Sequence, residues 1–92
     1  ARDGTDEGAE ARRLSVRRAH MERVSPMAAD GTLAVGGAIL DAPGGRMVGS
    51  IAVTAHADDA AARAWMAEDP YTTGGVWRDV SLYGTRFAPL PY

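Results

Sequence analysis

The pattern of hydrophobic and polar positions predicts a long helix in the first quarter of the chain. Thr5 or Asp6 suits its N-cap, because a short side-chain oxygen there accepts a backbone N–H of the first turn. We expect the helix to end at about Val24, because Pro26 follows and the residue before a proline avoids the α region.

The apolar side of this helix also carries two groups capable of chemistry. At about 100° per residue, Arg17 falls in the middle of that side, one turn before His20. The other positions that share this side are Leu14, Val16, Met21 and Val24. We therefore expect a guanidinium and an imidazole to face the core or a pocket within it.

A hairpin is predicted after the first helix. Residues 32–40 form a buried strand, residues 41–46 a loop, and residues 47–54 a returning strand whose side chains alternate between two faces. Gly36 and Gly37 interrupt the first strand, which indicates a bulge or a close approach by another group.

A second helix is predicted to begin at Asp58 or Asp59 and to end near Glu68, where Asp69-Pro70-Tyr71 stops it. Residues 72–75 then form a loop and residues 76–87 a final strand. Residues 89–92 contain two prolines, cannot extend a central strand and should be irregular.

The resulting order is helix, strand, strand, helix, strand. A ferredoxin-like α+β domain needs one more strand, placed before the first helix. Either that strand is missing from this chain, or residues 1–3 are its truncated remainder.

Composition narrows the choice of partners. Ninety-two residues predict one domain, residues 1–92, and much of the 46% hydrophobic content is alanine, so a homodimer is expected to cover one face. The net charge is −2, and acids interleave with the arginines of the first helix at spacings that suit ion pairs, which disfavours nucleic acid as a partner.

No apolar run approaches the roughly 18–20 residues of a membrane span, and no signal peptide opens the chain. We expect no membrane contact and a cytoplasmic protein.

The absence of cysteine excludes disulfides, thiol chemistry and cysteine-based zinc sites. The two histidines, His20 and His56, are far apart in the sequence and make a poor metal site. We therefore expect neither a metal nor a cofactor.

His20 is the strongest candidate for chemistry, because an imidazole exchanges protons near neutral pH. The alternative is a core histidine bonded to a backbone carbonyl. Asp69 precedes a proline at a helix end, where turn or cap formation is the commonest duty of aspartate. Arg17 either binds an anionic group of a substrate or pairs with an acid such as Asp3 or Asp69. Ser50 is a packing residue or a ligand contact, and no Gly-x-Ser-x-Gly motif surrounds it, which disfavours a serine hydrolase.

Several stretches together resemble the YciI-like (YCII) family in their order along nearly the whole chain. They are ARDG at 1–4, RRLSVRRAH at 12–20, GGAIL at 36–40, VGS at 48–50 and AEDPYTTGGVW at 67–77. The resemblance implies a ferredoxin-like fold of the dimeric α+β barrel type, with a His and an Asp as the catalytic centre.

By this resemblance, His20 and Asp69 are the expected catalytic residues. The expected substrate-binding residues are Arg17, Ser50, Gly37, Tyr71 and Asp3. The function that follows is a cofactor-free acid–base enzyme, lyase- or isomerase-like, acting on a small organic molecule that is anionic or cyclic. The alternative is a dimeric domain that binds a small ligand in the same pocket without performing chemistry.

Overall fold

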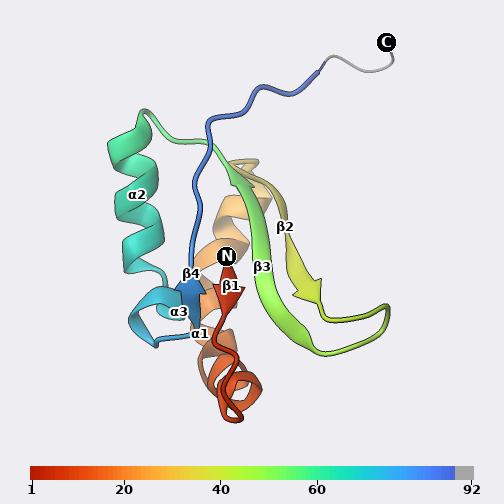
Figure 1. The fold of residues 1–92 in the computed structure, drawn as a ribbon. Coiled ribbons are helices and arrows are strands. Elements are labelled where there is room, and N and C mark those ends of the chain that lie inside the picture. Colours follow the sequence, from red (N-terminus) through yellow and green to blue (C-terminus); the bar gives the residue numbers. More distant parts are fainter. Residues whose placement is uncertain (89–92) are drawn as a thin grey trace.

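A four-stranded antiparallel sheet forms the centre of the protein, in the order β2-β3-β1-β4 (Figure 1). The computed structural model describes residues 1–88. The strands are β1 (Arg2–Asp3), β2 (Leu33–Leu40), β3 (Met47–Thr54) and β4 (Trp77–Asp79). Arg2 pairs with Gly49 on one side and with Asp79 on the other, so β1 is an inner strand. The expected ferredoxin-like α+β fold is therefore confirmed, with Arg2–Asp3 as its first strand.

Three helices accompany the sheet: α1 (Ala9–Asp30), α2 (Asp59–Glu68) and the short α3 (Pro70–Thr73). In Figure 1, α1 passes behind the sheet and α2 lies beyond the β4 edge. α1 packs against β2 and α3, while α2 packs against α3. No helix within residues 1–88 is long and apolar enough to cross a membrane.

The start of α1 differs from the prediction. The helix begins at Ala9 after Gly8, and no side chain caps it. Asp6 pairs with Arg12 in the second turn instead, at 2.7 Å. The carboxylate of Asp6 is thus bound by a guanidinium and not by a backbone N–H of the first turn.

The end of α1 also differs, because the helix continues through Pro26 and stops at Gly31, whose φ is 86°. A proline inside a helix costs about 3 kcal/mol. The additional turn brings Met27 to Trp65, whose Nε1 donates to the methionine Sδ at 3.2 Å. This tertiary contact stabilises the extension, and the sequence near the proline gave no sign of it.

The predicted loop at residues 72–75 is in part the helix α3, and the predicted strand at 76–87 shortens to β4. β4 pairs only with Arg2 and Asp3 of β1, and residues 80–88 have no neighbouring strand with which to continue the ladder. The prediction for residues 89–92 lies outside the described part of the chain.

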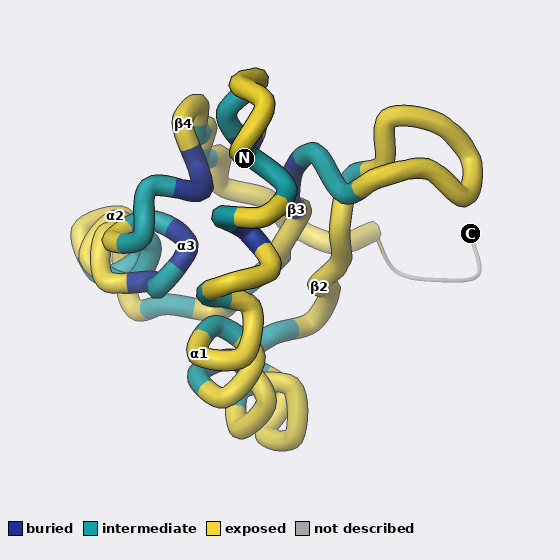
Figure 2. Tube along the Cα trace, turned by 90° about the horizontal axis from the view of Figure 1, so that it is seen from below, coloured by how far each residue is buried: buried dark blue, intermediate teal, exposed yellow. Residues whose placement is uncertain are grey.

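Burial concentrates where α1, α3 and β4 meet (Figure 2). Tyr71, Val76 and Trp77 form a small apolar core there. The predicted apolar face of α1 is wrong in part, since Leu14 and Met21 are 53% and 40% exposed. The buried residues of α1 are Arg13 and Val24, so the buried side is rotated towards positions 13, 16, 20 and 24.

Candidate active site

A cavity of about 600 Å³ lies between α1, the β2–β3 hairpin and the aromatic residues of α2, α3 and β4. We call it the His20 cavity. Five of the predicted site residues line it: Arg17, His20, Gly37, Ser50 and Tyr71. Asp69 and Asp3, the other two, lie behind this lining and hold residues that belong to it.

His20 is fixed by Asp69 from the end of α2. Its Nδ1 lies 2.8 Å from Oδ1 and 3.0 Å from Oδ2 of the carboxylate. Because an ionised carboxylate only accepts, Nδ1 carries the hydrogen and donates it. Nε2 has no hydrogen-bond partner within residues 1–88, and the ring is 14% exposed at the cavity. The imidazole therefore presents Nε2 to the cavity with no hydrogen-bond partner from the described chain.

Asp69 is completely buried and accepts three kinds of hydrogen bond. Besides His20, the backbone N–H of Tyr71 donates to Oδ1 at 2.9 Å and Arg23 Nη1 donates to Oδ2 at 3.2 Å. Burial raises the pKa of Asp69, but the bonds from His20 and Tyr71 and the charge of Arg23 outweigh it and hold this pKa below its usual value. The carboxylate is thus ionised at neutral pH.

The Asp-Pro sequence explains how the backbone delivers this carboxylate. Asp69 is the N-cap of α3, with Pro70 in the first helical turn, where the missing N–H costs nothing. The cap and the contact with His20 use the same side chain. The capping role and the site position are therefore not alternatives.

Arg13, which the sequence analysis did not single out, forms a second buried network. Its Nη1 lies 3.0 Å from both oxygens of Asp3, and its Nη2 donates to Ser50 Oγ at 2.8 Å. Trp77 Nε1 donates to the same oxygen at 3.1 Å. Arg13 Nε is buried with no partner among the described residues. Asp3 therefore anchors Arg13 and does not line the His20 cavity.

Aromatic rings connect the two networks. The ring of Tyr71 stacks on His20 with centroids 4.0 Å apart, and the Arg13 guanidinium lies 4.7 Å from the Tyr71 centroid. Trp77 meets His20 edge-on at 6.0 Å. Burial raises the pKa of the Tyr71 phenol, and the charges of Asp3 and Asp69 raise it further, against the opposing arginines. Tyr71 consequently stays protonated.

Arg17 lies exposed on α1 and lines the cavity, and no acid of residues 1–88 pairs with it. Arg13 forms an ion pair with Asp3, and Arg23 forms one with Asp69. The acids proposed as partners for Arg17 are therefore already paired. Gly37 borders the cavity with open space around the position of a Cβ.

Sequence reasoning missed Arg13, Arg23 and Trp77. Arg13 precedes Arg17 by four residues and His20 by seven, which is the spacing of one helix face. That spacing was a usable signal, but the run of arginines favoured ion pairs on the helix surface. Only Arg18 with Glu22 forms such a pair within α1, at 3.0 Å.

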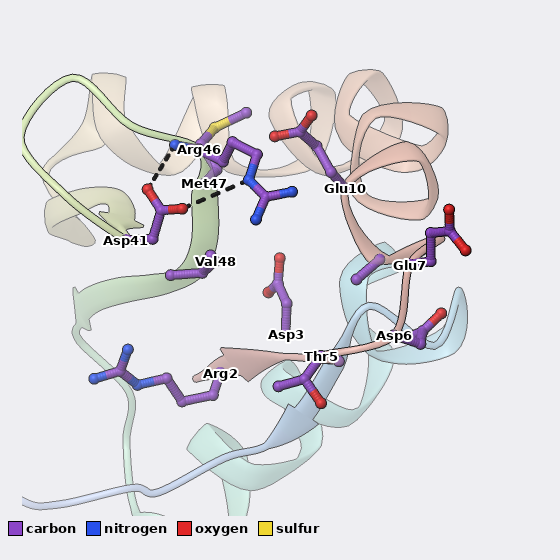
Figure 3. A pocket seen from close by; sticks show the side chains of 12 residues that line it. Arg2, Asp3, Thr5, Asp6, Glu7, Glu10, Asp41, Arg46, Met47 and Val48 are labelled. Atoms are coloured by element: carbon purple, nitrogen blue, oxygen red, sulfur yellow. Dashed lines mark hydrogen bonds and ion pairs between the residues drawn. The ribbon is translucent and has the colours of Figure 1, made fainter.

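A second cavity of about 590 Å³ lies around the start of α1 and the end of the hairpin loop, and we call it the Asp41 cavity (Figure 3). Asp41 accepts from the backbone N–H of Arg46 at 2.9 Å and pairs with its side chain at 3.5 Å. Asp3 also borders this cavity. The Asp3–Arg13 pair consequently stands between the two cavities.

No cluster of three or more His, Cys, Asp or Glu side chains within residues 1–88 is arranged to hold a metal ion.

Among solved structures, the chain is similar to 5-chloro-2-hydroxyhydroquinone dehydrochlorinase (TftG) from Burkholderia phenoliruptrix AC1100 in complex with 2,5-dihydroxybenzoquinone. The TM-score is 0.81 at 21% sequence identity, over 95% of this chain and 90% of that one. This likeness shows the shared fold. No curated protein matches the chain. The model of the YCII-related domain matches residues 4–86, and the chain therefore belongs to the YCII-related domain family.

Proposed function

We propose that this protein is an acid–base enzyme, lyase- or isomerase-like, that acts on a small anionic or cyclic organic molecule without a cofactor. His20 moves the proton, Asp69 orients His20, and Arg17 attracts an anionic group of the substrate. Gly37 and Tyr71 shape the wall against which the substrate lies.

The observation that carries this proposal is the hydrogen bond from His20 Nδ1 to the fully buried carboxylate of Asp69, at 2.8 Å. A carboxylate in this position fixes the imidazole tautomer and stabilises the imidazolium that forms when Nε2 takes a proton. General bases held in this way contribute about 10²- to 10⁴-fold to a reaction rate.

The reaction class follows from a single base beside a largely apolar wall. Nε2 takes a proton from a substrate carbon, and the electrons of that C–H bond form a carbon–carbon double bond. In an elimination, a group on the adjacent carbon leaves with its bonding electrons. In an isomerisation, the adjacent carbon is a carbonyl carbon whose π electrons move onto its oxygen, and the resulting enolate takes the proton back from the imidazolium at a different carbon of the conjugated system. The dehydrochlorinase of similar fold, which is named for loss of a chloride, supports elimination as the first choice.

The test needs a readout that does not depend on the leaving group. Incubation in deuterium oxide with a panel of enolisable ketones and hydroxylated rings, including 2,5-dihydroxybenzoquinone and 5-chloro-2-hydroxyhydroquinone, reports C–H exchange by proton NMR and chloride release by electrode. The native protein should accelerate exchange for part of this panel. His20→Gln should slow that exchange by about 100-fold or more.

His56→Gln is the matched control, because His56 bonds Thr54 at 2.9 Å and does not line the His20 cavity. It should exchange protons at the native rate. Equal rates for His20→Gln and the native protein would refute the proposal. Saturable binding of panel members with no exchange by the native protein would favour the non-catalytic ligand-binding domain.

A homodimer and a cytoplasmic location remain predictions. Val35 and Ile51 of the hairpin are 46% and 55% exposed, which supports a partner on this part of the sheet. Light scattering coupled to size exclusion should give twice the mass of the chain. A monomer at micromolar concentration would contradict the prediction.

A further inference from the structure

Ser50 occupies an unusual position in the hydrogen-bond network of the His20 cavity. It lies on β3, is 8% exposed, and lines the cavity together with His20. Its hydroxyl oxygen accepts one hydrogen bond from Arg13 Nη2 at 2.8 Å and another from Trp77 Nε1 at 3.1 Å. A guanidinium and an indole N–H can only donate, so the direction of both bonds is fixed.

The direction of these bonds decides what Ser50 can still do. A hydroxyl has two lone pairs and one hydrogen, and both lone pairs are used here. Its hydrogen has no acceptor among residues 1–88, although the side chain is nine-tenths buried. Ser50 can therefore only donate, and the cavity is the region where an acceptor has room.

The surroundings make this hydrogen a better donor than that of an ordinary serine. Arg13 is 3% exposed and held by both oxygens of Asp3, so its position is fixed before any ligand arrives. A bond from a charged donor polarises the O–H that receives it, and chains of such bonds strengthen one another. Arg17, which lines the same cavity and has no acidic partner in the described chain, adds positive charge.

We propose that the Ser50 hydroxyl donates a hydrogen bond to an anionic oxygen of the substrate, of the phenolate or enolate type. The substrate class is then a planar unsaturated molecule with such an oxygen, and the apolar side chains that line the cavity, among them Leu33, Ile51 and Trp65, offer it an apolar wall. This inference rests on the proposed function, in which removal of a proton from carbon places negative charge on a conjugated oxygen. A preorganised donor at that oxygen stabilises the charge as it develops.

The probe for this inference is 4-nitrophenolate, with nitrobenzene as a neutral ring of similar shape. Both are titrated against the native protein at a pH above the pKa of the phenol, with the absorbance of the bound phenolate as an optical readout. The native protein should bind the phenolate more tightly than nitrobenzene. Ser50→Ala should weaken phenolate binding by about tenfold, the usual contribution of one charge-assisted hydrogen bond, and should leave nitrobenzene within about twofold.

Two further variants keep the test decisive. Ser50→Thr retains the hydroxyl and should preserve the preference for the anion, which separates loss of the donor from damage to the fold. Ser25→Ala is the matched control, since Ser25 borders the same cavity but already donates to the Met21 carbonyl at 2.6 Å. Its preference for the anion should equal that of the native protein.

Two results would overturn the inference. One is a native protein that binds nitrobenzene as well as 4-nitrophenolate, and the other is a Ser50→Ala protein with an unchanged preference, as expected if Ser50 donates only to water. The proposed function is tested separately. It predicts that His20→Gln loses proton exchange, whereas this inference is tested by ligand binding alone.

Discussion

The two cavities have almost the same volume, about 600 Å³ around His20 and about 590 Å³ around Asp41, but their polar groups differ. In the His20 cavity, Arg13, His20 and Ser50 are held by partners, and His20 Nε2 and the Ser50 hydroxyl have capacity left for a ligand. In the Asp41 cavity, Asp41 and Arg46 are exposed and satisfy each other. The volume of a cavity is therefore a poor indicator of function, whereas fixed polar groups with an unused donor or acceptor are a good one.

The physical cost of the two arrangements explains the contrast. Buried charges lose hydration and are favourable only when partners replace the water, so every buried polar group near His20 reduces the stability that an apolar core would give. Exposed pairs such as Asp41–Arg46 keep their water and change stability little. A small domain that retains four buried polar residues, namely Asp3, Arg13, Ser50 and Asp69, carries this cost in the two networks around the His20 cavity, although Asp3 itself also borders the Asp41 cavity.

The largest difference between the two cavities should be in the rate of proton exchange, measured for Asp69→Asn in the His20 cavity and for Asp41→Asn in the Asp41 cavity. An amide at position 69 can donate to Nδ1 of His20 and so favour the wrong tautomer, which should slow proton exchange by about 10²- to 10⁴-fold. Nitrogen-15 NMR of the imidazole reports the tautomer directly. Asp41→Asn, in the other cavity, should keep the native rate, and equal losses in both variants would remove the distinction between the cavities.

Asp3→Asn should lower the free energy of unfolding more than Asp41→Asn does. It leaves the guanidinium of Arg13 buried without its counter-charge, at a cost of about 3 kcal/mol or more in the free energy of unfolding. The side chains of Asp41 and Arg46 are 39% and 71% exposed, so Asp41→Asn should cost less than about 1 kcal/mol. Urea unfolding measures both, and similar midpoints would contradict the burial of the Asp3–Arg13 pair.

Gly37→Val should fill the His20 cavity without disturbing the fold. A Cβ at this position meets nothing within 4 Å, and valine suits a strand, so stability should be kept. Binding of 4-nitrophenolate should weaken by about tenfold or more, which corresponds to about 1.4 kcal/mol. Gly84→Val is the control, because Gly84 is equally open and borders neither cavity. Unchanged binding by Gly37→Val would place the ligand elsewhere.

The smallest expected effect is on the free energy of unfolding in acid, and on how salt changes it, for variants of Asp69 and Asp6. Burial raises the pKa of Asp69, but the His20, Tyr71 and Arg23 contacts lower it more, so the folded value lies below the ordinary 3.8. The stabilisation by this carboxylate is therefore present above about pH 3.8 and is lost as the pH falls through the lower folded value. The free energy of unfolding of native protein and Asp69→Asn should converge in this acid range.

Asp6, which borders the Asp41 cavity, gives the matched comparison. The hydrogen bond from Arg12 lowers the pKa of Asp6 to about 2, but this pair is exposed to solvent. Added sodium chloride should therefore reduce the difference between native protein and Asp6→Asn, and should change the Asp69→Asn difference less. Equal salt sensitivity in acid-unfolding curves would show that Asp69 is not shielded.

The local elements followed from the sequence. α2 spans Asp59–Glu68, as predicted, with Asp58 as its N-cap, and the hairpin strands agree with their predicted ranges within one residue. Caps, turns and alternation depend on neighbours within a few positions, which is why a single sequence reveals them. The YCII resemblance supplied the fold and is confirmed by the family match.

Predictions that required knowledge of tertiary neighbours did less well. Pro26 lies inside α1 because packing against Trp65 stabilises the additional turn, and β4 is short because β1 offers only two residues to pair with. The apolar face assigned to α1 was also shifted. A displacement of one position rotates a helix face by about 100°, enough to exchange Leu14 for Arg13.

The sequence by itself determined α2, the hairpin and the approximate place of α1, and the YCII resemblance pointed to His20 and Asp69 as the residues to examine. Only the tertiary structure decided that Arg13 and Trp77 both donate to Ser50 Oγ, which leaves the Ser50 hydroxyl hydrogen without an acceptor among residues 1–88. These bonds join residues 37 and 27 positions apart. The Arg13 bond depends on the angle at which α1 meets the sheet, and the Trp77 bond depends on the placement of β3 and β4 on either side of β1. No local pattern along the chain encodes either arrangement.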